Sequence, residues 1–142
     1  MNRVNYQEDA TPWEFLRYRG AVLSAIKGKR GQKLLKDLLE AFDSMQIKEL
    51  VANELQGESG VCTLGCIAKA KGMDLSNWND FKSDIISKEL NIAKSLVNEI
   101  AFENDEICYF DKDSEKTRKK RWQKMRTWVE RKITKFGDKT CV

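Results

Sequence analysis

A short basic segment that contains two glycines is the first part of the chain that could bind a ligand. Residues 27–33, Lys-Gly-Lys-Arg-Gly-Gln-Lys, place four cations beside Gly28 and Gly31, directly before a predicted helix. Free backbone amides and the positive end of a helix favour an anion at such a place. The spacing lacks the G-x-x-x-x-G-K-[ST] pattern of a phosphate-binding loop. The segment therefore indicates either contact with an anion or nucleic acid, or a plain turn between two helices.

A second basic run, residues 116–126, has seven lysines and arginines among its eleven residues. Such cations neutralise phosphates, and Trp122 within the run would stack on a base if it were exposed. Trp122 also falls on an apolar helical stripe, which favours a place in the core. The run indicates direct binding of nucleic acid, docking on an acidic protein surface, or a solvated helix face.

The two runs, together with two arginines before the first of them, define a candidate binding surface, which we call the basic surface. It consists of Arg17, Arg19, Lys27, Lys29, Arg30, Lys33, Arg118, Lys119, Lys120, Arg121, Lys124 and Arg126. Residues 17–36 carry seven bases and no acid (+7), residues 37–115 seven bases and seventeen acids (−10), and residues 116–135 ten bases and one acid (+9). If the basic segments are helices of one domain, they can share a face. This polarity predicts an oriented interaction surface.

A secondary polar cluster consists of Glu103, Asn104, Asp105 and Glu106. Clustered carboxylates can hold a divalent cation or supply an acid and a base. The spacing fits no EF-hand loop, and a polar turn that caps a helix or pairs with the basic segments is the simpler interpretation. The sequence predicts a loop over residues 104–113.

The cysteines are the remaining candidates for ligation chemistry: Cys62, Cys66, Cys108 and Cys141. Cys62 and Cys66 share one helix face, but their segment is apolar, where buried free thiols are the ordinary outcome. The chain has no histidine, which excludes Ser-His-Asp and Cys-His nucleophiles and every histidine-ligated metal. We therefore predict no metal, no cofactor and no catalytic residue, and expect a protein that binds rather than catalyses.

Helical periodicity organises the chain, beginning with a start signal at residues 11–14. Thr11 and Glu14 fit a capping box, and Pro12 suits the first helical position. The apolar face predicted for this helix consists of Trp13, Leu16, Val22, Leu23 and Ile26. Gly28 ends the helix, and a second one is predicted to begin near Gly31.

The second helix has an apolar stripe of period 3.6 that runs from Leu34 to Met45. Residues 47–55 indicate a short helix or a strand, with a spacing that favours helix, and residues 57–60 indicate a turn. An apolar helix over residues 61–71 is predicted to be buried and central. Its small residues let a neighbouring helix approach, and Gly72 closes it in a left-handed conformation.

The rest of the chain predicts a loop and a loose helix over residues 73–89, a clear helix over residues 91–102, and a long helix over residues 114–136 that Ser114 caps. The apolar stripe of the long helix consists of Trp122, Met125, Val129, Ile133 and Phe136. The predicted fold is all-α, a compact single domain of five or six helices over residues 1–142. Residues 1–10 and 137–142 are expected to be flexible.

Composition limits the cellular setting. Hydrophobic residues make up 41% and charged residues 34% of the 142 residues, enough for a core inside a charged exterior. The polar N-terminus lacks the apolar region of a secretory signal, and no stretch approaches the roughly eighteen apolar residues of a membrane span. We expect a cytoplasmic protein with reduced cysteines and no membrane association.

Four segments resemble a family of small accessory proteins carried by phages and prophages of Gram-negative bacteria. They are RYRGAVLSAIKGKRGQKLLKDLLEAF, VCTLGCIAKAKG, IAKSLVNEIAFENDE and RWQKMRTWVERKI. The similar pattern is RG-A-x-S-A-I-R-G-K-R-G-Q, V-C-A-L-G-A, E-N-D-E and R-W-x-x-M-x-x-W-V, over residues 15–133. Thr63 and Cys66 stand where it has alanines. The resemblance implies a phage context, in which small proteins bind host machinery and many block a defence complex, and it implies no catalytic residue.

Three functional hypotheses follow. The first is a non-catalytic phage protein that binds a host protein or nucleoprotein complex through the basic surface, as an anti-defence or anti-CRISPR-like inhibitor. The second is direct binding of DNA or RNA by the same residues, which predicts a steep loss of affinity with salt. The third is binding of a nucleotide or another small molecule in a pocket that joins the residue 27–33 turn to the Glu103–Glu106 cluster. The sequence leaves the partner and the oligomeric state open.

Overall fold

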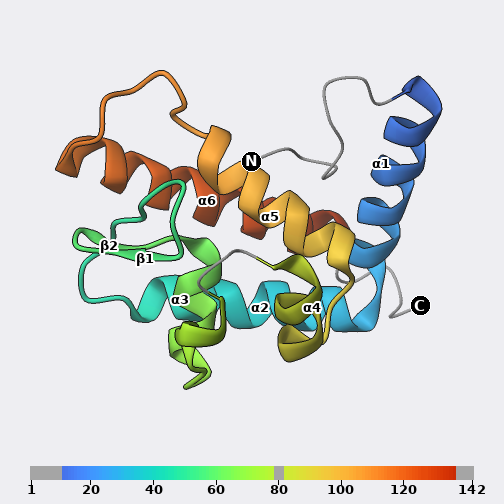
Figure 1. Ribbon diagram of the computed structural model, residues 1–142, viewed down its shortest axis with the longest axis horizontal. Coiled ribbons are helices and arrows are strands. Elements are labelled where there is room, and N and C mark those ends of the chain that lie inside the picture. Colours follow the sequence, from blue (N-terminus) through green and yellow to red (C-terminus); the bar gives the residue numbers. More distant parts are fainter. Residues whose placement is uncertain (1–10, 79–81, 137–142) are drawn as a thin grey trace.

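The computed structural model describes residues 11–78 and 82–136 (Figure 1). The helices in this part are α1 (Pro12–Lys27), α2 (Lys29–Ser44), α3 (Thr63–Ala70), α4 (Ser83–Leu90), α5 (Lys94–Glu106) and α6 (Glu115–Phe136). A 3-10 helix, η1 (Leu75–Trp78), and an antiparallel pair of two-residue strands, β1 (Gln56–Gly57) and β2 (Gly60–Val61), complete it. The all-α prediction with a long C-terminal helix is confirmed. The ends for which we predict flexibility, residues 1–10 and 137–142, lie outside the described residues.

Local signals set the ends of several helices as predicted. The Thr11 hydroxyl oxygen accepts from the Glu14 amide at 3.2 Å, and the Glu14 carboxylate accepts from the Thr11 amide at 2.9 Å. Both halves of the capping box are therefore present at the start of α1. Ser114 caps α6 in a similar way, because its hydroxyl oxygen accepts from the Thr117 amide at 3.2 Å. Gly72 follows α3 with φ +68°, in the left-handed region.

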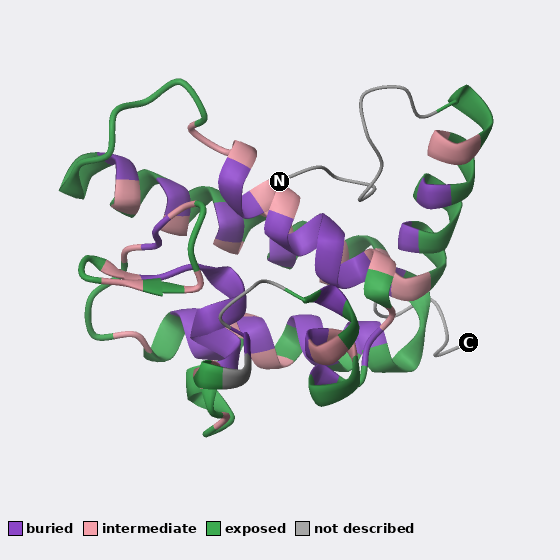
Figure 2. Cartoon of the chain, in the orientation of Figure 1, coloured by how far each residue is buried: buried purple, intermediate pink, exposed green. Residues whose placement is uncertain are grey.

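The core lies where α2, α3, α5 and α6 meet. α2 packs along α6, α3 contacts both α2 and α5, and α4 covers one side of α5. Residues 63–68 of α3 are all buried, so the prediction of a central apolar helix is confirmed. Figure 2 shows buried segments of these helices turned toward one another. Within the described residues, no helix has the length and apolar character that a membrane span requires.

Helix α1 stands at one end of the molecule, where it contacts α5, α2 and the α6 helix (Figure 1). Its buried side chains are Tyr18, Val22 and Ile26. The prediction for its apolar face is only partly right, since Trp13, Leu16 and Leu23 are exposed at 67%, 60% and 41%. Figure 2 shows the outer side of α1 as exposed along its length.

Residues 47–55 form neither of the predicted elements. Their backbone groups are bonded to distant parts of the chain instead: the Leu50 amide donates to the Arg118 carbonyl, and the Val51 amide donates to the Val61 carbonyl. The segment therefore crosses between α6 and the hairpin as an irregular strand-like stretch. The predicted turn at residues 57–60 is confirmed as the hairpin turn.

Further boundaries differ from the prediction, among them the start of α5 at Lys94 rather than at residue 91. α2 begins at Lys29 rather than near Gly31, because the Gly28 carbonyl already accepts from the Gln32 amide at 3.0 Å. α5 continues through Glu106 rather than ending near Phe102. The Glu103–Glu106 cluster is consequently the last turn of a helix and not part of a loop.

Gly65 of α3 is required by close packing, although its neighbour is a loop and not the predicted helix. A Cβ atom at Gly65 would lie 2.3 Å from the Leu55 carbonyl oxygen. Gly65→Ala is expected to lower the free energy of unfolding by about 2 kcal/mol, because backbone must move to accept the methyl group. Urea unfolding measures this effect. Gly20→Ala is the matched control, since nothing lies within 4 Å of a Cβ there, and helix propensity predicts a gain of about 1 kcal/mol.

Candidate functional site

Most cations that α6 contributes to the basic surface are held by carboxylates of the same molecule. Arg118 bonds Glu49 at 3.0 Å and Asp113 at 3.2 Å. These hydrogen bonds, above all the one that Arg118 donates to Glu49, raise the pKa of Arg118. The pairs join α6 to the irregular segment at residues 47–55 and to the loop before α6.

Arg126 uses all three of its side-chain nitrogen atoms in ion pairs. Its Nε and Nη2 atoms bond the two oxygens of Asp43 at 2.7 and 3.1 Å, and its Nη1 atom bonds Glu130 at 2.7 Å. The hydrogen bond from Arg126 lowers the pKa of Asp43. A bidentate pair of this kind is stronger than a single contact and links α6 to the end of α2.

Lys119 and Lys120 form exposed pairs that a partner could open. Lys119 bonds Glu115 at 2.7 Å, and Lys120 bonds Asp111 at 3.0 Å. The hydrogen bond to Asp111 is the main cause of the raised pKa of Lys120. Exposed pairs contribute little to stability. Lys124 is exposed and forms no ion pair with a residue of the described ranges.

Arg121 lies inside the protein rather than on the basic surface. Its side chain is 4% exposed, and it donates to the Asn104 carbonyl at 3.0 Å and to the Leu50 carbonyl at 3.1 Å. Arginine suits this place because its fork of donors satisfies two carbonyls at once. Arg121 therefore joins α6 to the end of α5 and to the irregular segment, and it is not available to a partner.

Asn104 occupies the centre of a buried polar network. Its side-chain oxygen accepts from the Thr63 amide at 3.0 Å and from the Thr63 hydroxyl at 2.8 Å. Its side-chain nitrogen donates to the Val51 carbonyl at 2.9 Å and to Asp105 at 3.1 Å. Asp105 in turn accepts from the amide of Asn53, whose φ is +64°. These contacts give Asn104 and Asp105 a structural role, while Glu103 faces a cleft and Glu106 is half-buried.

The cations of the N-terminal half make fewer side-chain hydrogen bonds and ion pairs than those of α6. Among the described residues, Arg17, Arg19 and Lys29 are exposed and make no side-chain hydrogen bond or ion pair. Arg30 donates to Asn91 at 3.0 Å, and Lys33 lies 3.6 Å from Asp37. Lys27 is exposed, with its ammonium 5.4 Å from the centre of the Phe136 ring. The structure thus divides the predicted basic surface into an N-terminal part with free cations and an α6 part that is largely neutralised.

The turn between α1 and α2 lines an open groove of about 550 Å³. Gly28, Lys29 and Arg30 form one side of it, and Ala93 and Ser95, at the start of α5, form the other. Neither α2 nor α5 has a side-chain cap at its N-terminus. Amides at both helix starts therefore lack a side-chain acceptor. Contact with an anion and a plain turn both remain predictions for this segment.

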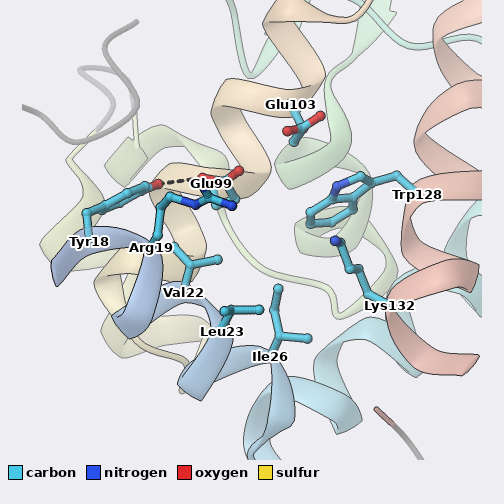
Figure 3. A pocket seen from close by; sticks show the side chains of 9 residues that line it. All are labelled: Tyr18, Arg19, Val22, Leu23, Ile26, Glu99, Glu103, Trp128 and Lys132. Carbon is cyan, nitrogen blue, oxygen red and sulfur yellow. Dashed lines mark hydrogen bonds between the residues drawn. The ribbon is translucent and has the colours of Figure 1, made fainter. Parts of the chain in front are cut away.

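A separate cleft of about 340 Å³ lies between α1, α5 and α6 (Figure 3). It is lined by Tyr18, Arg19, Val22, Leu23, Ile26, Glu99, Glu103, Trp128 and Lys132. The Tyr18 hydroxyl donates to the Glu99 carboxylate at 2.8 Å on its wall. The cleft brings together Arg19 and Glu103 of the predicted sets, but its lining includes no residue of the 27–33 turn. The pocket predicted to join that turn to the Glu103–Glu106 cluster is therefore not formed by this cleft.

Two cysteines are buried thiols without a place in any of these surfaces. Burial raises the pKa of Cys62 to about 12 and that of Cys66 to about 11. Both remain protonated at neutral pH and are unreactive. No three acid, cysteine or histidine side chains gather as a metal site within the described ranges, and Cys141 lies outside them.

Helical periodicity alone did not identify the outer face of α1 as exposed. Trp13, Leu16 and Leu23 are large apolar side chains that the rest of the protein leaves exposed, and the free cations Arg17 and Arg19 belong to the same helix. The signal that identifies them is a second apolar set on α1, formed by Phe15, Tyr18, Val22 and Ile26, which supplies the core contacts. The core of the protein therefore uses one apolar set of α1 and leaves the other exposed.

Comparison of the chain with protein-family models, with curated proteins and with solved structures gives no match.

Proposed function

We propose that the protein is a non-catalytic, phage-encoded accessory protein that binds an acidic host protein or nucleoprotein complex through α1 and the α1–α2 turn. In the phage context that the sequence resemblance implies, the consequence of binding is inhibition of a host defence complex. The observation that carries the proposal is the coincidence, on one helix, of exposed large apolar side chains and free cations. Exposed apolar patches among polar residues mark protein interaction sites.

The distribution of charge supports this part of the surface over α6. Arg17, Arg19 and Lys29 have no intramolecular partner to lose among the described residues, so an acidic partner meets them without first breaking an ion pair. Arg118 and Arg126, by contrast, already satisfy two carboxylates each. A partner that displaced those carboxylates would gain little net attraction.

Arg17→Ala/Arg19→Ala/Lys29→Ala is expected to weaken capture of the partner by about tenfold or more, because three uncompensated positive charges leave the interface. The measurement is a pull-down of the tagged protein from a Gram-negative host lysate, with and without nuclease, quantified by mass spectrometry. The matched control is Lys116→Ala/Lys124→Ala/Arg131→Ala, which removes the same charge from exposed positions of α6 and is expected to retain the partner.

The reverse result, loss of capture only in the control variant, would move the interface to α6. Failure of the unmodified protein to retain any host protein after nuclease treatment would contradict the proposed function itself. Circular dichroism of both triple variants shows whether the helices are kept.

A second function, direct binding of nucleic acid, is favoured by the groove at the α1–α2 turn. There Lys29 and Arg30 begin α2 across the groove from the start of α5, and neither helix start has a side-chain cap. This arrangement suits a phosphate. In the same pull-down, loss of every captured partner on nuclease treatment is the outcome that supports this function over the first.

A further inference from the structure

The outer face of α1 is a narrow apolar ridge with a gap in it. Trp13, Leu16, Gly20 and Leu23 follow one another at steps of three, four and three residues. At 3.6 residues per turn these four positions span an arc of about 80°, on the side of α1 opposite Val22. Because the three large side chains are exposed at 41% or more, the protein's own core leaves the ridge uncovered on either side of Gly20.

Gly20 has no packing role among the residues that the structure describes. Nothing lies within 4 Å of a Cβ atom at this position, and its helical backbone needs no glycine. At Gly31 and Gly65, by contrast, a Cβ would lie 1.9 Å and 2.3 Å from a carbonyl oxygen. Glycine in mid-helix is less stable than alanine, so its presence between Leu16 and Leu23 is unexplained by the fold. Without a side chain there, another surface can approach the α1 backbone closely.

Cations border the ridge on both sides. Arg17 and Arg19 each lie about 40° beyond one edge of the apolar arc, and Lys27 lies beyond its C-terminal end. Glu14 is the single acidic residue of α1, and its carboxylate is engaged in the capping box. In a symmetric contact of ridge against ridge, a second copy of this chain would place the same cations against each other, so that arrangement is disfavoured by charge. An acidic partner is favoured for the same reason.

We propose that α1 inserts as a helix into an apolar groove with a carboxylate rim on the acidic host protein. Leu16 and Leu23 enter the groove, Gly20 lets a groove wall contact the α1 backbone, and Arg17 and Arg19 pair with carboxylates on opposite rims. This is the mode in which an amphipathic helix is recognised through anchors spaced by three, four and seven residues. The inference rests on the proposed function and specifies its partner surface.

The test introduces the photoreactive residue p-benzoylphenylalanine into the full chain in place of Leu16. A matched protein carries it in place of Thr127, which is exposed on α6. Both are irradiated in nuclease-treated host lysate, and the cross-linked peptides are sequenced. We expect the Leu16 position to cross-link to a partner segment whose apolar residues are flanked by aspartate and glutamate, and the Thr127 position to give less than a tenth of that yield.

Binding of the purified partner is then measured with two Gly20 variants. Gly20→Leu fills the gap and is expected to weaken binding at least tenfold, while Gly20→Ala weakens it less and raises the thermal midpoint of the free protein by about 3 °C. Lower affinity in a more stable protein cannot arise from unfolding.

Three results would overturn the inference: cross-linking from the Thr127 position in place of Leu16, a cross-linked segment that is basic, or unchanged affinity of Gly20→Leu. All three leave the binding of a host protein standing. The first would move its interface to α6 and the second would change the charge of the partner, whereas unchanged affinity of Gly20→Leu leaves the proposed α1 interface in place. The proposed function fails separately if the unmodified chain retains no host protein.

Discussion

Asn104→Ala is expected to lower the free energy of unfolding by about 4 kcal/mol. The substitution leaves the Thr63 amide and hydroxyl and the Val51 carbonyl, all bonded to Asn104, without these partners in the interior. Each buried polar group that loses its partner costs about 1–3 kcal/mol, and partial entry of water reduces the sum. Guanidinium unfolding followed by circular dichroism measures the change.

Glu106, two residues after Asn104, offers a control for this prediction. Glu106→Ala removes a half-buried side chain of the same helical turn and is expected to change the free energy of unfolding by less than about 1 kcal/mol. Equal midpoints for the two variants would show that the Asn104 network does not hold the fold together. The comparison also decides between a structural and a ligand-binding role, because only a structural role predicts the large loss in the free protein.

Alkaline pH is expected to unfold the protein through its buried thiols. In the unfolded chain both thiols have a pKa near the ordinary value of 9.0, whereas burial raises the folded values to about 12 for Cys62 and about 11 for Cys66. The unfolded state therefore releases protons first as pH rises, so stability is complete below pH 9 and falls above it. Between pH 9 and 11 the loss is about 2 kcal/mol for each thiol.

Cys66→Ala isolates the contribution of one thiol to this pH dependence. All other groups that titrate at alkaline pH are shared by the two proteins, so the variant should lose about 2 kcal/mol less than the unmodified protein between pH 9 and 11. Urea unfolding at a series of pH values measures the difference. Identical slopes against pH would mean that the Cys66 thiol ionises without unfolding.

The local start signals and the apolar stripes of α2 and α3 were predictable from the sequence because their causes lie within a few residues. Thr11 and Glu14 cap α1 by bonds that span three residues. The stripe of α2 is likewise a property of one helix. Trp122, predicted for the core, is half-buried and packs edge-on against Phe42 with ring centres 6.4 Å apart.

The predictions fail where contacts with distant parts of the chain determine the structure of a segment. Residues 47–55 have the spacing of a helix, but α6 and the hairpin take up their backbone groups. On α6 the buried line runs at steps of four through Thr117, Arg121, Met125 and Val129, and an arginine on that line was assigned to the surface by its charge alone. The two carbonyls that receive its donors come from other segments, which no periodicity within α6 reveals.

The candidate site was only partly predictable for the same reason. Arg17, Arg19 and Lys29 were identified by composition, and the structure leaves them exposed. Whether a cation is free or paired depends on carboxylates elsewhere in the chain, such as Asp43 and Glu49. The sequence also carries two apolar sets on α1 and does not say which of them the core uses.

The separation of the buried and the exposed apolar side chains of α1 has a consequence for the evolution of the sequence. Tyr18, Val22 and Ile26 anchor α1, and the capping box fixes its start, so the core contacts of α1 do not depend on Trp13, Leu16, Gly20 or Leu23. In the proposed mode of binding, substitutions along that edge alter recognition at little cost in stability, because these side chains are exposed. If the proposed partner changes its groove by mutation, α1 can therefore acquire a new complementary shape while the rest of the fold is inherited unchanged.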